Sequence, residues 1–152
     1  MDGVEIDYAI LAEHAEVANN KLYLMGGGWD TMAVPDVPAT VRLTMVAGVR
    51  VDWDETNVQI PMSVRVTDED AQEVLRIDGS MNVGRPPQLV GGSSQLSQMT
   101  FVLNMGLPRF GGYQVTIQAG AGDAVISRSL PFRLTKGAAP IAKPQTTTPP
   151  SA

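Results

Sequence analysis

The amino-acid sequence predicts an all-β protein, an antiparallel immunoglobulin-like β-sandwich of about seven to nine strands. The first observation is residues 41–51, where every odd position is apolar. The second is residues 58–66, where the apolar side chains occupy the even positions. The third is that the same spacing returns along most of the chain up to residue 134. A period of two places one face of a strand in a core and the other face in water.

The two runs are joined by a short polar turn at residues 52–57. Strand patterns on either side of such a turn predict an antiparallel hairpin. One parity of this hairpin is apolar and is expected to be buried: Leu43, Met45, Val49, Ile60, Met62 and Val64. The other parity is polar and is expected to be mostly exposed: Arg42, Thr44, Arg50, Gln59, Ser63 and Arg65.

The segment before this hairpin predicts two further strands. The first is expected over residues 5–13, although a helix over residues 9–18 is an alternative. Two asparagines at the centre of residues 18–21 favour a chain reversal, since Asn tolerates left-handed dihedrals. The second strand is expected over residues 22–32, with a bulge at the glycines of 26–28. A phosphate-binding glycine loop is a weaker alternative, because no Lys-Ser/Thr pair follows.

The second half of the chain continues the two-residue period in four segments: 75–83, 99–105, 113–119 and 124–134. The longest connection is residues 84–98, which we expect to be the most mobile loop. Tyr113 is expected to form a tyrosine corner, a structural feature of immunoglobulin-like sandwiches. Arg128 shares the apolar parity of the last segment, so a bulge or a sheet edge is expected near it.

Composition predicts one domain over residues 1–135, followed by a disordered tail or linker over residues 136–152. The tail contains four prolines and three consecutive threonines and has little to bury. The chain has no cysteine, no apolar run of membrane-spanning length and no basic, apolar leader at its N-terminus. We therefore expect a cytoplasmic protein that does not enter a membrane.

The formal net charge of −5 argues against a nucleic-acid partner, because phosphate binding needs clustered Lys and Arg. The charge is unevenly distributed along the chain. Residues 1–78 hold fifteen acidic and five basic side chains, whereas residues 79–152 hold one acidic and six basic side chains. This asymmetry either reflects solubility alone or predicts a charged docking surface.

Several segments resemble a family of small, uncharacterised bacterial β-sandwich proteins. Residues 9–17, 21–26 and 29–30 resemble the opening strands of that family, and residues 107–117 resemble its late Leu-Pro to Tyr segment. The resemblance covers most of residues 5–134 and implies the fold, with no known activity, cofactor or substrate. Ala12 and His14 depart from the Cys and aromatic residues that the family often has there.

No residue pattern points to catalysis or to a bound metal, so we expect neither an enzyme nor a cofactor. His14 is the only histidine, and nothing in the sequence places a serine nucleophile beside it. The acid-rich turns 52–57 and 67–72 lack the spacing of a calcium-binding loop. If each strand reverses direction, they lie at opposite ends of the sandwich, so we interpret both as solvated turns.

Strand reversal also predicts which loops gather together. One end should collect residues 14–20, 52–57, 84–98 and 120–123, and the other end residues 34–38, 67–72 and 107–112. Loops at one end of a rigid scaffold commonly carry binding. We therefore take as candidate binding residues the acid-rich turn with its tryptophan and the lone histidine: Asp52, Trp53, Asp54, Glu55, Asn57 and His14. Trp53 either anchors a partner or caps the core.

The sequence thus favours a non-enzymatic binding or scaffold module. Its partner would be another protein or further copies of the chain, engaged through loops, a sheet edge or a charged face. A sandwich that binds a small ligand or a carbohydrate is the alternative prediction.

Overall fold

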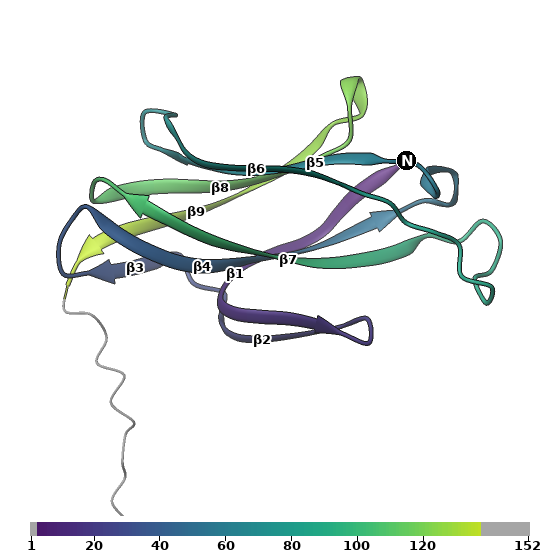
Figure 1. The fold of residues 1–152 in the computed structure, drawn as a ribbon, viewed down its shortest axis with the longest axis horizontal. Coiled ribbons are helices and arrows are strands. Elements are labelled where there is room, and N and C mark those ends of the chain that lie inside the picture. Colours follow the sequence, from purple (N-terminus) through teal and green to yellow (C-terminus); the bar gives the residue numbers. More distant parts are fainter. Residues whose placement is uncertain (1–2, 138–152) are drawn as a thin grey trace, which may run out of the picture.

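The computed structural model describes residues 3–137 as two packed β-sheets (Figure 1). The first sheet has four strands in the order β2 (Lys21–Gly27), β1 (Val4–Ala18), β4 (Ala39–Val51) and β7 (Gln95–Leu107). The second has five in the order β3 (Thr31–Val34), β9 (Ile126–Lys136), β8 (Gly111–Ala119), β5 (Ile60–Asp68) and β6 (Glu73–Met81). Helical structure in the described residues is limited to the 3-10 turns η1 (Trp53–Glu55) and η2 (Gly122–Ala124). The predicted all-β sandwich is confirmed, and its immunoglobulin-like detail stays a prediction.

The core lies between the two sheets and contains the apolar parity that the sequence predicts. All six residues expected to be buried are at most 8% exposed: Leu43, Met45, Val49, Ile60, Met62 and Val64. All strand pairs are antiparallel except β3 with β9, which is parallel. Burial of this continuous apolar layer is the main stabilising contribution to such a fold.

The predicted central hairpin is wrong, although both of its strands exist. β4 pairs with β1 and β7, whereas β5 pairs with β6 and β8 in the other sheet. Residues 52–59 cross from one sheet to the other and include the turn η1. A period of two shows which face of a strand is buried. It does not show which strand is the hydrogen-bonded neighbour.

The predicted second strand over residues 22–32 is also wrong, because it divides into β2 and β3 in different sheets. The chain leaves β2 at Gly28, whose φ is +82° and whose amide donates to the carbonyl of Leu11 at 2.9 Å. A positive φ suits glycine, which has no Cβ to clash. The helical alternative for residues 9–18 is wrong as well, since β1 continues as a strand to Ala18.

The end of β1 and all of β2 form a hairpin that folds back over the outer face of the first sheet (Figure 1). Its tip has positive φ at Asn19 and Asn20, as the predicted turn requires. The carbonyl of Asn20 accepts a bond from Gln98 Nε2 in β7 at 2.8 Å. β2 and β7 are at opposite edges of the sheet, so this contact requires the hairpin to cross the sheet face.

The folded-back hairpin explains an error in the predicted exposure. Thr44 faces outward on β4 but is 1% exposed, and the neighbouring outward residue Val46 is fully buried. Ser63 is also buried, since it is a short side chain between the longer cross-strand neighbours Asp78 and Gln118. The remaining predictions divide evenly: Arg42 and Gln59 are exposed, and Arg50 and Arg65 are partly buried.

Arg128 lies where the sequence predicts a sheet edge. β3 pairs only with residues 133–136 of β9, so the stretch of β9 that contains Arg128 has no β3 neighbour. The guanidinium of Arg128 donates to the carbonyl of Ile6 in β1 at 2.7 Å and thereby links the two sheets.

β9 runs through Lys136, one residue beyond the predicted domain boundary. The remainder of the predicted tail, residues 138–152, lies outside the described residues. Within residues 3–137 there is no helix with the length and apolar character needed to cross a membrane.

Candidate functional site

The two acid-rich turns lie at opposite ends of the sandwich, as strand reversal predicts. β5 runs from the turn 52–59 to the turn 68–72, which places these turns at opposite ends. The turn 68–72 meets residues 109–112, and the turn 52–59 meets residues 120–126 across a groove. We name these the Arg109 end and the Trp53 end.

At the Trp53 end, the tryptophan of η1 is half-buried and carries an arginine on its ring. The guanidinium carbon of Arg85 lies 3.8 Å from the ring centre of Trp53. Arg85 also donates to Thr56 Oγ1 at 2.6 Å and to the carbonyl of Trp53 at 2.8 Å. Such a stack combines cation–π attraction with packing. Trp53 is therefore held by Arg85, and it is not among the side chains packed against the core.

Two of the candidate residues hold the Trp53 turn in place. Asp52 Oδ2 accepts a bond from the amide of Gly3 at 3.0 Å, and the Asp52 amide donates to the carbonyl of Gly3 at 2.9 Å. Asn57 has a φ of +60°, and its amide donates to the carbonyl of Val83 at 2.8 Å. These bonds join the turn to the start of β1 and to the loop after β6.

The acidic side chains of Asp54 and Glu55 differ from Asp52, since neither accepts a hydrogen bond within the described residues. Asp54 is exposed and Glu55 is partly exposed.

His14 is not in a loop, contrary to the prediction for residues 14–20, because β1 extends to Ala18. Its Nε2 lies 3.3 Å from Glu16 Oε1 on the exposed face of the folded-back hairpin. Tyr23 and Met25 are its exposed apolar neighbours there. Among the contacts of the described residues, none joins His14 to the Trp53 turn, so the six candidates do not form one site.

A groove of about 530 Å³ lies between the Trp53 turn and the loop that connects β8 to β9. Val58 and Val125 both line it, and they are 44% and 42% exposed. Glu55 and Asp123 contribute one carboxylate from each side. Val58 belongs to the parity that the sequence predicts to be buried, and no sequence pattern pointed to Val125. The one indication of this groove in the sequence is Asp123, the sole acidic residue of the second half, which Ala124 and Val125 follow.

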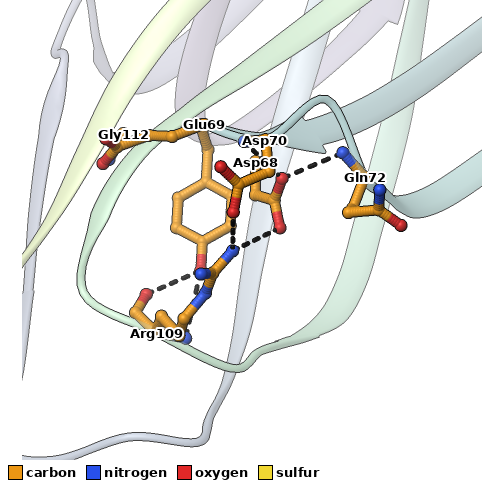
Figure 2. Close-up of polar contacts among 7 residues, drawn as sticks. Asp68, Glu69, Asp70, Gln72, Arg109 and Gly112 are labelled. Carbon is orange, nitrogen blue, oxygen red and sulfur yellow. Dashed lines mark hydrogen bonds and ion pairs between the residues drawn. The ribbon is translucent and has the colours of Figure 1, made fainter.

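At the Arg109 end, side chains of the acidic turn bond to Arg109 and to backbone amides (Figure 2), beside a pocket of about 580 Å³ that Asp68 and Glu69 help to line. Arg109 Nη2 lies 2.8 Å from Asp68 Oδ2 and 3.1 Å from Asp70 Oδ2. Glu69 Oε1 accepts a bond from the amide of Gly112 at 2.6 Å. The predicted tyrosine corner is confirmed, because the Tyr113 hydroxyl donates to the carbonyl of Arg109 at 2.6 Å and accepts from its amide at 3.2 Å.

These contacts shift two ionisation equilibria at the Arg109 end. The pKa of Asp68 lies below its ordinary value, mainly because the amide of Gln72 donates to its carboxylate at 2.9 Å. The amide of Asp70 and the guanidinium of Arg109 act in the same direction, whereas desolvation opposes them. The pKa of Arg109 is raised by its bonds to Asp70 and Asp68. The charged forms of both groups are thus stabilised by the fold.

No group of three or more metal-binding side chains converges within residues 3–137. At the Arg109 end the carboxylates bind Arg109 and backbone amides, and at the Trp53 end no three carboxylates of the described residues converge.

The sequence model of a family of unknown function, DUF6941, matches residues 7–135. The chain belongs to this family. The predicted resemblance to a family of uncharacterised proteins is thereby confirmed for the domain. No curated protein matches the chain.

Among solved structures, the chain is similar to a crystal structure of the C-terminal domain of Wzt. The similarity covers 91% of this chain and 77% of that chain, with a TM-score of 0.45 and 11% sequence identity. A likeness of this extent carries no functional argument for the DUF6941 domain.

Proposed function

We propose that this DUF6941 domain is a non-enzymatic binding module that engages a protein partner through the groove at the Trp53 end. The observation that carries the proposal is a concave surface with two exposed valines and, on each side, a carboxylate that no group of residues 3–137 pairs. Apolar area in a groove supplies affinity when it leaves water, and rim charges supply steering. The partner segment would accordingly be aliphatic and flanked by Lys or Arg.

The wall of the groove is held in a way that suits binding. Hydrogen bonds of Asp52, Asn57 and Arg85 fix the Trp53 turn to two other segments, the start of β1 and the loop after β6. A fixed turn does not have to be ordered when the partner arrives, so less conformational entropy is lost. In this proposal Trp53 supports the groove, and Val58, Val125, Glu55 and Asp123 contact the partner.

The cytoplasm is the proposed location. A chain with no cysteine needs no oxidising compartment for its folding. The small-ligand or carbohydrate-binding sandwich stays the alternative prediction, and the experiment below separates it from protein binding.

The test uses a random peptide library displayed on phage and panned against the full chain. Recovered peptides should combine aliphatic and basic residues, and binding of their synthetic forms should weaken as salt rises. Val125→Asp should reduce the affinity at least about tenfold, since it places a desolvated charge in the apolar contact. Asp123→Lys should remove most of the salt dependence.

The matched control is Asp30→Lys, which makes the same charge change at the Arg109 end, where Asp30 lines a separate pocket. Peptides that bind Val125→Asp and the parent chain equally would place the site elsewhere. If no peptide is recovered and a glycan array gives specific binding at the groove, the alternative function replaces this one.

A further inference from the structure

β7 is a long edge strand whose outer side has no partner in the described part of the chain. All thirteen of its residues pair with β4, from Gln95 opposite Val51 to Leu107 opposite Ala39, without a bulge. Its other side forms no ladder with any strand of residues 3–137. Because alternate residues of an edge strand direct their N–H and C=O groups outward, β7 offers a regular template for another strand.

β7 also lacks the features with which proteins normally protect such an edge. It contains no charged residue and no proline. By contrast, β6, the edge strand beside it in the other sheet, carries Glu73, Arg76 and Asp78. Long, flat, uncharged edges left open lead to uncontrolled association, so natural proteins guard or cover them. The β7 edge is therefore expected to be covered in solution.

The surface next to the edge is apolar. A groove of about 280 Å³ lies between β6 and β7 and is lined by Met62, Ile77, Met81, Met99 and Phe101, among others. On the outer face of the sheet, Val102 is 44% exposed. Pairing at this edge would remove apolar surface from water on both faces of the sheet.

We propose that a second copy of this chain covers the edge by antiparallel pairing of the two β7 strands around a two-fold axis at Phe101. This surface is separate from the groove at the Trp53 end, and the proposal does not depend on that groove.

The β7 sequence is complementary to itself in this register. Thr100 would pair with Val102 of the second copy on the outer face, and Met99 with Leu103 on the core face. In each pair the two residue numbers add up to twice 101, so they are both odd or both even. The two paired side chains therefore lie on the same face of the sheet. Pairs of β-branched side chains and pairs of apolar side chains both stabilise neighbouring strands.

Charge on the adjacent strand does not oppose a second copy. The two β6 strands would approach each other in antiparallel orientation on the same side of the dimer. Within each chain Arg76 already bonds Asp78 at 3.0 Å and Glu73 at 3.4 Å, so the facing strands would present paired charges of both signs. The chain's own residues 138–152 are a poorer occupant, since their four prolines lack the N–H that a ladder needs.

The test measures the mass of the full chain by sedimentation velocity from about 10 µM to about 1 mM, the range of weak protein association. The wild-type chain should pass reversibly from monomer to dimer. A double variant, Thr100→Lys with Val102→Lys, should weaken the dimer at least about 100-fold, because like charges meet twice across the axis. The corresponding Glu variant should behave similarly, and an equimolar mixture of the two variants should restore association.

The matched control is Tyr23→Lys with Met25→Lys, since these residues are 54% and 70% exposed on the other edge strand, β2. This control should dimerise like the wild-type chain. A wild-type chain that stays monomeric up to about 1 mM, or a Thr100/Val102 variant that dimerises normally, would refute the proposal.

A cysteine experiment then tests the register of the two β7 strands. Single cysteine substitutions disturb the fold less than paired lysines do, and the chain has no native cysteine to interfere. Thr100→Cys chains mixed with Val102→Cys chains should form a disulfide-linked dimer on mild oxidation. Each variant alone should link poorly, because identical positions are offset by two residues and disulfides need short Cα separations. Equal linking in all three samples would exclude the axis at Phe101.

Discussion

The two ends of the sandwich carry similar acid-rich turns and use them in different ways. At the Arg109 end, three consecutive acidic residues bind Arg109 and backbone amides, so groups of the chain itself satisfy their carboxylates. At the Trp53 end, Asp52 is used structurally, but Glu55 and Asp123 face an open groove. The two turns thus differ in whether a cation of the chain itself pairs with them, and in the proposed function this difference leaves the Trp53 turn for a partner. Four experiments can break or sharpen this contrast.

The largest effect on stability is expected from Tyr113→Phe at the Arg109 end. Tyr113 is 3% exposed, and its hydroxyl bonds both the carbonyl and the amide of Arg109. Removing it leaves backbone groups without their partner, which should lower the free energy of unfolding by about 1–3 kcal/mol. Urea denaturation should show a lower midpoint with an unchanged slope. An unchanged midpoint would mean that the hydroxyl bonds of Tyr113 at the Arg109 end contribute little to stability.

A smaller effect is expected from Arg85→Met at the Trp53 end. The substitution keeps a long apolar side chain but removes the charge that lies on the Trp53 ring and the bonds to Thr56 and the carbonyl of Trp53. The free energy of unfolding should fall by about 0.5–1 kcal/mol, the range for a solvent-exposed cation–π contact. Fluorescence should report a more exposed Trp53. A loss as large as that of Tyr113→Phe would remove the contrast between the ends.

The stability of the Arg109 end should depend on pH through Asp68. Because the pKa of folded Asp68 is lowered from its ordinary value of 3.8, its ionised form stabilises the fold above that pH. This contribution is lost as the pH falls through the lower, folded pKa. Asp68→Asn should therefore be less stable at neutral pH and lose less stability on acidification below pH 3.8. An acid profile of Asp68→Asn that runs parallel to the wild-type profile would contradict the assignment.

The smallest effect is expected from Asp123→Asn combined with Glu55→Gln. Neither carboxylate accepts a hydrogen bond within the described residues, so the free energy of unfolding should change by no more than about 0.5 kcal/mol. Affinity for a basic peptide should nevertheless fall. A large loss of stability would show that the groove is part of the folded framework, which would weaken its proposed use as a binding surface.

Prediction from the sequence succeeded where the evidence was local. The parity of residues 41–51 and 58–66 identified the buried side chains, because alternation is a property of each strand alone. Asn19 and Asn20 identified a reversal for the same reason, since their tolerance of positive φ is intrinsic. Tyr113 was assigned correctly from its place before a strand pattern.

Prediction failed where a second segment decided the outcome. The partner of β4 could not be derived from β4, and the hairpin with β5 was the wrong choice. His14 was grouped with Trp53 by counting loops, but the length of β1 placed it on a strand. The two halves of the sequence do differ in charge, but they meet in the folded chain. In space Arg109 of the second half pairs with Asp68 and Asp70 of the first.

The sequence by itself determined the all-β class, the inward face of each central strand and most of the turns, because these follow from the φ, ψ and side-chain preferences of neighbouring residues. Only the tertiary structure decided that β4 and β5 belong to different sheets and that the β1–β2 hairpin covers the outer face at Val46. It also decided that Arg109 pairs with one acidic turn, while Glu55 of the other lines the groove at the Trp53 end. Those features depend on contacts between residues far apart in the chain, and the free energy of such contacts is not encoded in either segment alone.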